Sequence, residues 1–236
     1  MCFTVSIFAS THTIETEVGA VFDSAEEYQP YVYVTGFVFP RLPFITNKNP
    51  GSIEFAEWGL IPRWTKDEAA ACDLRKMTLN ARCETVYEKP SFRDAVTKRR
   101  GLLPVQGFIE WQHEGNTKLP HLVRMQNKKL FTLGCIWEDW INKEHGEVHR
   151  TFSIVTTQAN MLMSRVHNQK QRMPVIIQPS DREAWLHAED REIIEPLFRP
   201  LEDGVLEAFQ VTREVSVVKV NREEEELLEP MGPVFS

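Results

Sequence analysis

Cysteines are few in this sequence, and they are scattered. There are four, Cys2, Cys72, Cys83 and Cys135, and no two of them form a C-x-x-C pair. The sequence therefore predicts neither a disulfide framework nor a zinc site, and a reducing compartment is expected. Long apolar runs are lacking too, since no stretch approaches the length of a transmembrane helix. The N-terminus also lacks the basic region and cleavage site of a secretory signal. We therefore expect a cytoplasmic protein with no membrane association, no metal and no cofactor.

An excess of positive charge is also absent. The chain carries 27 Lys and Arg against 34 Asp and Glu, a formal net charge of −7, which by itself argues against nucleic-acid binding. The charges are unevenly distributed, however. Acidic residues concentrate at 183–207 and 223–226, whereas basic residues bunch at 75–76, 98–100 and 170–172. A local basic groove on an acidic protein is compatible with this pattern.

Internal repeats, low-complexity linkers and clear domain boundaries are absent, which favours one domain over residues 1–236, with 223–236 as an acidic C-terminal tail. Many short alternating segments and few long helical ones predict an α+β fold on a large, mostly antiparallel, partly closed β-sheet with short peripheral helices. Ser91 is expected to cap one helix and Ser180 another, through a Ser-x-x-Glu box. The predicted strands include 2–9, 31–39, 78–84, 107–113, 129–137, 149–157 and 215–220.

The first two residues, Met1-Cys2, point to chemistry. Removal of Met1 is expected because the second side chain is small, and it leaves a cysteine with a free α-amine beside its thiol. Reference pKa values of roughly 8 and 8.5 make both groups partly nucleophilic near neutral pH. Such an aminothiol can attack an aldehyde through nitrogen and close through sulfur to a thiazolidine, or act as a thiolate with its amine as base. A cysteine that is merely the start of a strand is the alternative.

Asn80, Arg82 and Glu84 alternate along one predicted strand. Alternate residues of a strand share a face, so an amide, a guanidinium and a carboxylate would form a polar wall. Arginine can hold a phosphate in bidentate fashion. A surface strand with an internal Arg82–Glu84 pair is the alternative.

Glu110 lies within the apolar run Gly107-Phe108-Ile109-Glu110-Trp111. Burial there would raise the pKa of its carboxyl toward neutrality, which suits general acid–base work. His167 follows a predicted helix and can exchange protons near pH 7. A buried salt bridge for Glu110 and a helix-capping role for His167 remain the alternatives.

Trp58 and Trp64 bracket a loop that contains Pro62. Trp64, between basic residues, could stack on an unpaired base, a contact worth about 1–3 kcal/mol. A core position is the alternative for Trp64 and is favoured for Trp58.

The order of these motifs is more specific than any one of them. Along the chain come Met1-Cys2, W-G-x-x-P-x-W from Trp58, N-A-R-x-E-T from Asn80, G-F-x-E-W from Gly107, and His167 ahead of R-M-P. This order resembles the SRAP family, the SOS-response-associated peptidases, from about residue 2 to 177, with weaker similarity at 215–221.

The resemblance implies a sheet-rich domain with a positively charged groove for single-stranded DNA. It implies that Cys2 bonds the ring-opened aldehyde of an abasic site as a thiazolidine, in the response to DNA damage. The catalytic residues would be Cys2, Asn80, Glu110 and His167, and the DNA contacts Arg82, Trp64 and Arg172. We expect a monomer that removes its own Met1 and is nucleoid-associated when bound to DNA.

The sequence also departs from the family pattern. Phe3-Thr4 stands where the family has Gly-Arg, so a backbone-contacting arginine is missing, and the loop from His167 to Arg172 is longer than in the shortest members. Three other functions stay open. They are a glutamine amidotransferase of the N-terminal-nucleophile kind, which would need glycine-rich loops that this chain lacks, a reader of modified bases, and a cysteine peptidase.

Overall fold

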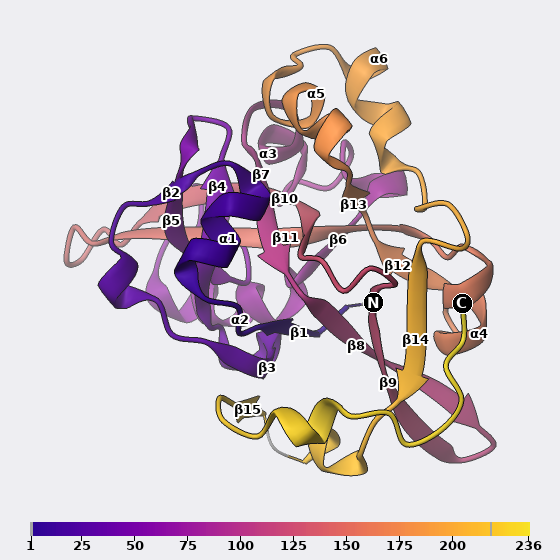
Figure 1. Cartoon of the computed structure of the whole chain (residues 1–236). Coiled ribbons are helices and arrows are strands. Elements are labelled where there is room, and N and C mark those ends of the chain that lie inside the picture. Colours follow the sequence, from indigo (N-terminus) through magenta and orange to yellow (C-terminus); the bar gives the residue numbers. More distant parts are fainter. Residues whose placement is uncertain (1, 218) are drawn as a thin grey trace.

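The computed structural model describes residues 2–217 and 219–236; Met1, whose removal is predicted, and Val218 lie outside the described residues. Two β-sheets form the body of the domain, and short helices lie around them (Figure 1). The predicted α+β class, with a mostly antiparallel and partly closed arrangement, is confirmed, and the strands are shared between two sheets. In the described residues no helix is long and apolar enough to cross a membrane.

The first sheet is antiparallel throughout. Its six strands are, in spatial order, β14 (Leu206–Gln210), β9 (Thr117–Met125), β8 (Gly107–Glu114), β1 (Thr4–Ile7), β3 (Tyr31–Thr35) and β15 (Val220–Asn221). β1 is therefore an inner strand, and all four of its residues are buried. Burial on both faces explains why its sequence is apolar or small throughout.

The second sheet is mixed and partly closed. Its strands are β2 (Val21–Phe22), β4 (Arg41–Thr46), β5 (Asn49–Trp58), β6 (Asn80–Arg82), β7 (Arg100–Val105), β10 (Phe131–Ile141), β11 (Val148–Gln158), β12 (Arg172–Pro174) and β13 (Ile176–Ile177). Five of them form a ring in which β5 pairs with β4, β4 with β7, β7 with β10, β10 with β11, and β11 with β5 again. The strand β6 joins it by parallel pairing with β11.

The helices are short. They are α1 (Thr11–Val18), α2 (Glu68–Met77), α3 (Arg93–Lys98), α4 (Met161–Val166), α5 (Arg182–His187) and α6 (Arg191–Ile194). In Figure 1, α5 and α6 lie at one end of the molecule and the C-terminal segment with β15 at the other. That segment packs on the first sheet, because Leu228 is buried and Phe235 pairs with Ala208.

Trp58 belongs to the core, as favoured from the sequence. Its side chain is fully buried, stacks on Phe152 and donates its indole N–H to the carbonyl of Leu79 at 2.8 Å. A Cβ on Gly36 would lie 2.9 Å from the Trp58 ring. This close approach accounts for a glycine at the point where β3 ends and a 3₁₀ turn (Gly36–Val38) replaces the predicted continuation of the strand.

Several local predictions were wrong. Ser91 does not cap α3, because the carbonyl of Lys89 already accepts from the N–H groups of Phe92 and Arg93. Ser180 does not form a capping box either, since residues 179–181 make a 3₁₀ turn ahead of α5. The predicted strand at 215–220 begins within a 3₁₀ helix (Arg213–Ser216), and β15 begins at Val220; Val218 of this range lies outside the described residues.

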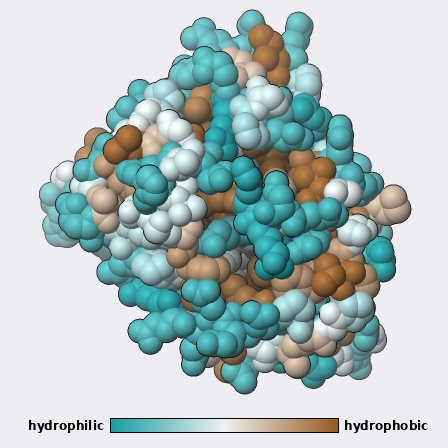
Figure 2. Space-filling view, in the orientation of Figure 1, coloured by the Kyte–Doolittle hydropathy of each residue, from teal (hydrophilic) through white to brown (hydrophobic). Residues whose placement is uncertain are grey.

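Hydrophobic side chains on the face seen in Figure 2 concentrate in a central hollow, whereas the surrounding surface is mostly hydrophilic.

Candidate active site

Strand pairing brings Glu110 to the beginning of the chain. β1 and β8 are antiparallel, with Thr4 opposite Ile109 and Val5 opposite Phe108, so continuing the register sets Phe3 against Glu110. The expectation that strand 107–113 runs beside the first strand is confirmed. Glu110 is 2% exposed.

Asn80 holds the main chain of Cys2. Its side-chain Nδ2 donates to the Cys2 carbonyl at 2.8 Å, across 78 residues of sequence. The parallel pairing of β6 with β11, with Asn80 opposite Ile154, fixes Asn80 where the two sheets meet. An amide donor aimed at a carbonyl fixes the direction of that peptide unit.

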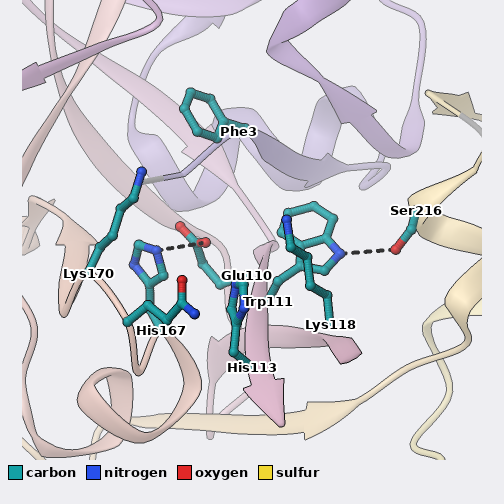
Figure 3. Close-up of a pocket in the computed structure, with 9 residues that line it drawn as sticks. Phe3, Glu110, Trp111, His113, Lys118, His167, Lys170 and Ser216 are labelled. Carbon is teal, nitrogen blue, oxygen red and sulfur yellow. Dashed lines mark hydrogen bonds and ion pairs between the residues drawn. The ribbon is translucent and has the colours of Figure 1, made fainter. Parts of the chain in front are cut away.

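His167 closes the site from the end of α4. Its Nδ1 lies 3.0 Å from the carbonyl oxygen of Arg172. A carbonyl can only accept, so Nδ1 carries the proton and Nε2 is the acceptor nitrogen. That Nε2 lies 3.9 Å from Oε2 of Glu110, and Figure 3 shows the two groups facing each other. The distance is too long for a hydrogen bond.

Burial sets the protonation of this pair. Desolvation raises the pKa of Glu110 to about 7 and lowers the pKa of His167 to about 4. At neutral pH the imidazole is therefore uncharged, and the carboxyl takes up and releases a proton near the working pH. A carboxyl of this kind can serve as either acid or base.

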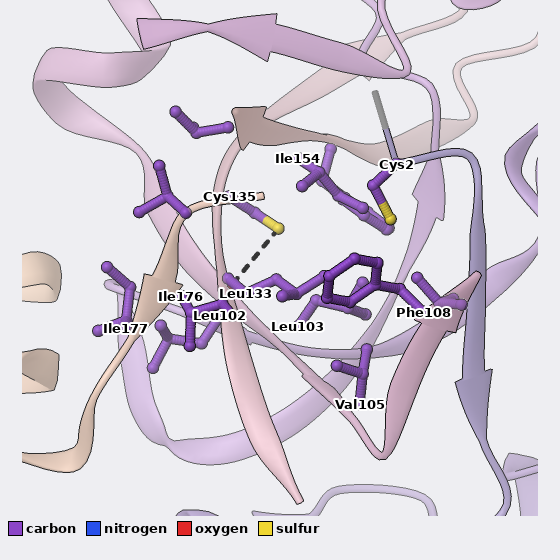
Figure 4. Packing of buried hydrophobic residues seen from close by; sticks show 14 of the residues in the cluster. Cys2, Leu102, Leu103, Val105, Phe108, Leu133, Cys135, Ile154, Ile176 and Ile177 are labelled. Carbon is purple, nitrogen blue, oxygen red and sulfur yellow. Dashed lines mark hydrogen bonds between the residues drawn. The ribbon is translucent and has the colours of Figure 1, made fainter. Parts of the chain in front are cut away.

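The thiol of Cys2 lies in the hydrophobic core. Its side chain is fully buried beside Phe108 and Leu103 (Figure 4), and Sγ–H donates to the carbonyl of Thr4 at 3.9 Å. Desolvation raises the pKa of the Cys2 thiol, and the charge of Glu110 raises it further. The expectation of a thiol partly ionised near neutral pH is therefore wrong for this arrangement, because the sulfur lies in the core.

An open cavity of about 510 Å³ lies over Glu110 and His167. It is lined by Phe3, Glu110, Trp111, His113, Lys118, His167, Gln169, Lys170 and Ser216. The indole N–H of Trp111 donates to Oγ of Ser216 at 3.0 Å, which ties the C-terminal part of the chain to the cavity wall. Phe3, Trp111, Lys118 and Lys170 were not predicted as lining residues, although the basic cluster at 170–172 was a signal for Lys170.

Arg82 and Trp64 are exposed, as a ligand-contacting role requires. The Arg82 side chain is 61% exposed, with Nε 3.9 Å from Oε2 of Glu84. Trp64 is 53% exposed and donates weakly to the carbonyl of Pro90 at 3.5 Å. In the part of the chain that the structure describes, neither lines the cavity.

Arg172 is not exposed. Its guanidinium donates hydrogen bonds to both carboxylate oxygens of Glu84 and to the carbonyl of Thr156, the last at 2.7 Å. The Arg172 side chain is 6% exposed. The prediction that Glu84 shares a strand face with Asn80 and Arg82 was wrong, because β6 ends at Arg82 and a 3₁₀ turn (Cys83–Thr85) directs Glu84 to Arg172. Arg172 in this arrangement supports the fold rather than a ligand.

Within residues 2–217 and 219–236, no group of three His, Cys, Asp or Glu side chains is placed to hold a metal ion. The residues that face the cavity instead offer acid–base and hydrogen-bonding groups beside the main chain of Cys2.

Similarity to known proteins is extensive. The chain is 34% identical over 204 residues to the abasic site processing protein YoqW of Bacillus subtilis, covering 84% of this chain and 86% of that protein. It is 30% identical over 169 residues to the abasic site processing protein HMCES of Gallus gallus, covering 62% of this chain and 49% of that protein.

The fold is shared with solved structures. A crystal structure of a Bacteroides thetaiotaomicron protein superimposes with a TM-score of 0.91 at 33% identity, covering 97% of this chain and 99% of that chain. A Bordetella bronchiseptica protein gives a TM-score of 0.79 at 21% identity, covering 89% of this chain and 100% of that chain, which shows the fold alone. The family model of the SOS response associated peptidases matches residues 1–218. The chain therefore belongs to the SOS response associated peptidase (SRAP) family.

Proposed function

We propose that this protein processes abasic sites in single-stranded DNA, forming a thiazolidine crosslink through Cys2 once Met1 has been removed. The proposal is carried by two observations: Asn80 donates to the Cys2 carbonyl, and Glu110, which the strand register sets opposite Phe3, faces His167 beneath the cavity. The relatives named abasic site processing proteins support the choice of lesion.

The chemistry balances without a cofactor. The ring-opened deoxyribose presents an aldehyde, and the Cys2 amine adds to its carbon. Loss of water gives an imine, and the departing oxygen takes a proton from Glu110, whose pKa near 7 suits the transfer. The thiol then adds to the imine carbon, and its proton passes to nitrogen. Aldehyde plus aminothiol thus give a thiazolidine and one water.

His167 and Asn80 have supporting roles in this mechanism. The unprotonated Nε2 of His167 can accept the proton of the sugar hydroxyl as the deoxyribose ring opens. Asn80, through the Cys2 carbonyl, keeps the new amine oriented toward the cavity. The only peptide bond that we expect this site to cut is the one between Met1 and Cys2.

Ring closure requires the thiol to leave the core. Rotation about the Cα–Cβ bond of Cys2 moves Sγ from its place beside Phe108 toward the cavity side. Removal of Met1 creates an α-ammonium on the same residue, and a positive charge at that distance lowers the pKa of the thiol. Because the thiol is buried until this rotation takes place, the amine in its unprotonated form is expected to react before the sulfur does.

Two exposed side chains outside the cavity are proposed to hold the DNA. Arg82 supplies a cation for a phosphate, and Trp64 supplies an aromatic face for an unpaired base. The protein is proposed to act as a monomer, with the DNA-bound form associated with the nucleoid.

The test uses Met1-free protein and a single-stranded oligonucleotide that carries one abasic site, analysed on a denaturing gel. Wild-type protein should give a slower covalent band, and Cys2→Ala should give none. Cys135→Ala removes a buried thiol and Cys72→Ala an exposed one, so both serve as matched controls that should retain the band. A wild-type protein without a band, or a Cys2→Ala variant that keeps it, refutes the proposal.

A further inference from the structure

Two lysines stand on opposite sides of the cavity. Lys170 lies on the loop between α4 and β12, and Lys118 lies on β9, paired with His113 of β8. Both line the cavity, and Figure 3 shows Lys170 on the side of Glu110 and His167, and Lys118 on the side of Trp111. A ligand in the cavity over Glu110 therefore lies near two ammonium groups.

The loop that carries Lys170 is fastened to β8. The side chain of Asn168 donates to the carbonyl of His113 at 2.9 Å and accepts from the N–H of the same residue at 3.0 Å. This pair of bonds imitates a step of β-pairing. The N–H of Gln171 donates to the carbonyl of His167 at 2.8 Å, which closes the loop at its far end. The backbone of Lys170 is thus held while its side chain extends over the cavity.

Neither lysine forms a salt bridge in the part of the chain that the structure describes. In the described residues no carboxylate lies within salt-bridge distance of either ammonium group, whereas Arg172 is tied to Glu84 and Arg82 lies near the same carboxylate. The neutral imidazole of His167 adds no charge, and the carboxyl of Glu110 is only partly ionised near pH 7. The chain has a net charge of −7, yet two lysines without a salt bridge among the described residues line one cavity.

We propose that Lys170 and Lys118 form a phosphate clamp that binds two backbone phosphates of a single DNA strand, one on each side of the nucleotide over Glu110. Lysine suits this role as a strong point charge that follows a mobile phosphate. Asn168 is the positioning residue for Lys170. The inference rests on the proposed function for its ligand. It assigns to these two lysines the binding of the strand on both sides of the lesion.

The experiment measures binding of an undamaged single-stranded oligonucleotide to the full chain by fluorescence anisotropy across a salt series. Each phosphate contact on a single strand contributes about 0.7 to the slope of log K against log salt. Lys118→Ala and Lys170→Ala should each reduce the slope by about 0.7, and the double variant by about 1.4. Lys143→Ala, at an exposed turn away from the cavity, should leave it unchanged.

Two further variants separate contact from folding. Lys170→Arg keeps the charge and should keep the slope. Asn168→Ala should weaken binding in the wild-type background but add nothing in the Lys170→Ala background, because it acts through that lysine.

Slopes that stay at the wild-type value in both alanine variants overturn the clamp, even if crosslinking proceeds normally. A slope that falls equally for Lys143→Ala also overturns it, because the effect is then one of general charge. If the slopes fall as expected but the wild-type protein never crosslinks to an abasic site, the clamp stands and the proposed function fails.

Discussion

Glu110 should make the folded protein less stable as the pH rises. Its pKa is raised from 4.5 to about 7, and each unit corresponds to about 1.4 kcal/mol, so ionisation in place costs roughly 3 kcal/mol. Since Glu110 is 2% exposed, solvent screening does not reduce this cost. The carboxyl of Glu110 is thus stabilised in its neutral form by the fold.

Whether the free energy of unfolding rises or falls with pH depends on which state, folded or unfolded, binds more protons. Below pH 4.5 the carboxyl is protonated in both states. As the pH rises the unfolded chain ionises first, so the folded state binds more protons and the free energy of unfolding falls. The loss is complete once the pH has passed the folded-state pKa of about 7. Glu110→Gln removes this titration, so the stability of the variant relative to wild type should rise by about 2.5 kcal/mol from pH 5 to pH 8.

Urea denaturation followed by tryptophan fluorescence at pH 5, 6, 7 and 8 measures this difference. The control is Glu202→Gln, an exposed carboxyl, for which the difference from wild type should not vary with pH in this way. Both variants must share the processing state of wild type at the N-terminus. A Glu110→Gln variant whose advantage is equal at pH 5 and pH 8 would show that the carboxyl is not desolvated as described.

Three other predictions follow from single contacts. Arg172→Ala should lower the free energy of unfolding by about 1–3 kcal/mol, because Glu84 and Thr156 lose the hydrogen bonds that Arg172 donates. A variant with a normal urea midpoint, whose DNA affinity depends less steeply on salt, would instead show that Arg172 contacts the ligand. Asn80→Ala should cost about 1 kcal/mol of stability and slow crosslinking at saturating DNA, and an unchanged single-turnover rate would contradict the orienting role. Trp64→Ala should weaken single-strand binding by about 1–3 kcal/mol without changing the salt slope or the melting temperature, and a large loss of stability would place the ring in the core.

The sequence was informative where the structure is local. Alternation and β-forming residues predicted β1 and β8, and the position of Glu110 within an apolar run predicted a buried carboxyl with a raised pKa. The end of α4 at His167 was predicted as well. These features depend on neighbours a few residues away, which is the range that sequence patterns report.

Features that depend on tertiary pairing were not predicted. Alternation could not tell which way Cys2 points, because β1 is buried on both faces and every residue in it is apolar or small. The turn after Arg82 gave no clear sequence signal, and Glu84 pairs with Arg172, 88 residues away. Lys118 reaches the cavity only because β9 pairs with β8. Register and sheet order are properties of the whole chain.

The position of Cys2 separates its two nucleophiles. Its main chain is fixed by Asn80 beside Glu110, whereas its thiol lies in the core beside Phe108 with a raised pKa. A thiol stored in this way resists oxidation and alkylation, because those reactions need an accessible thiolate. In the proposed mechanism, an aldehyde that reaches the cavity meets the amine first, and the imine then offers the sulfur a carbon one rotation away. If the proposed mechanism holds, the burial of the thiol restricts its reactions to a carbon already bound to Cys2, which favours ring closure over general nucleophilic attack.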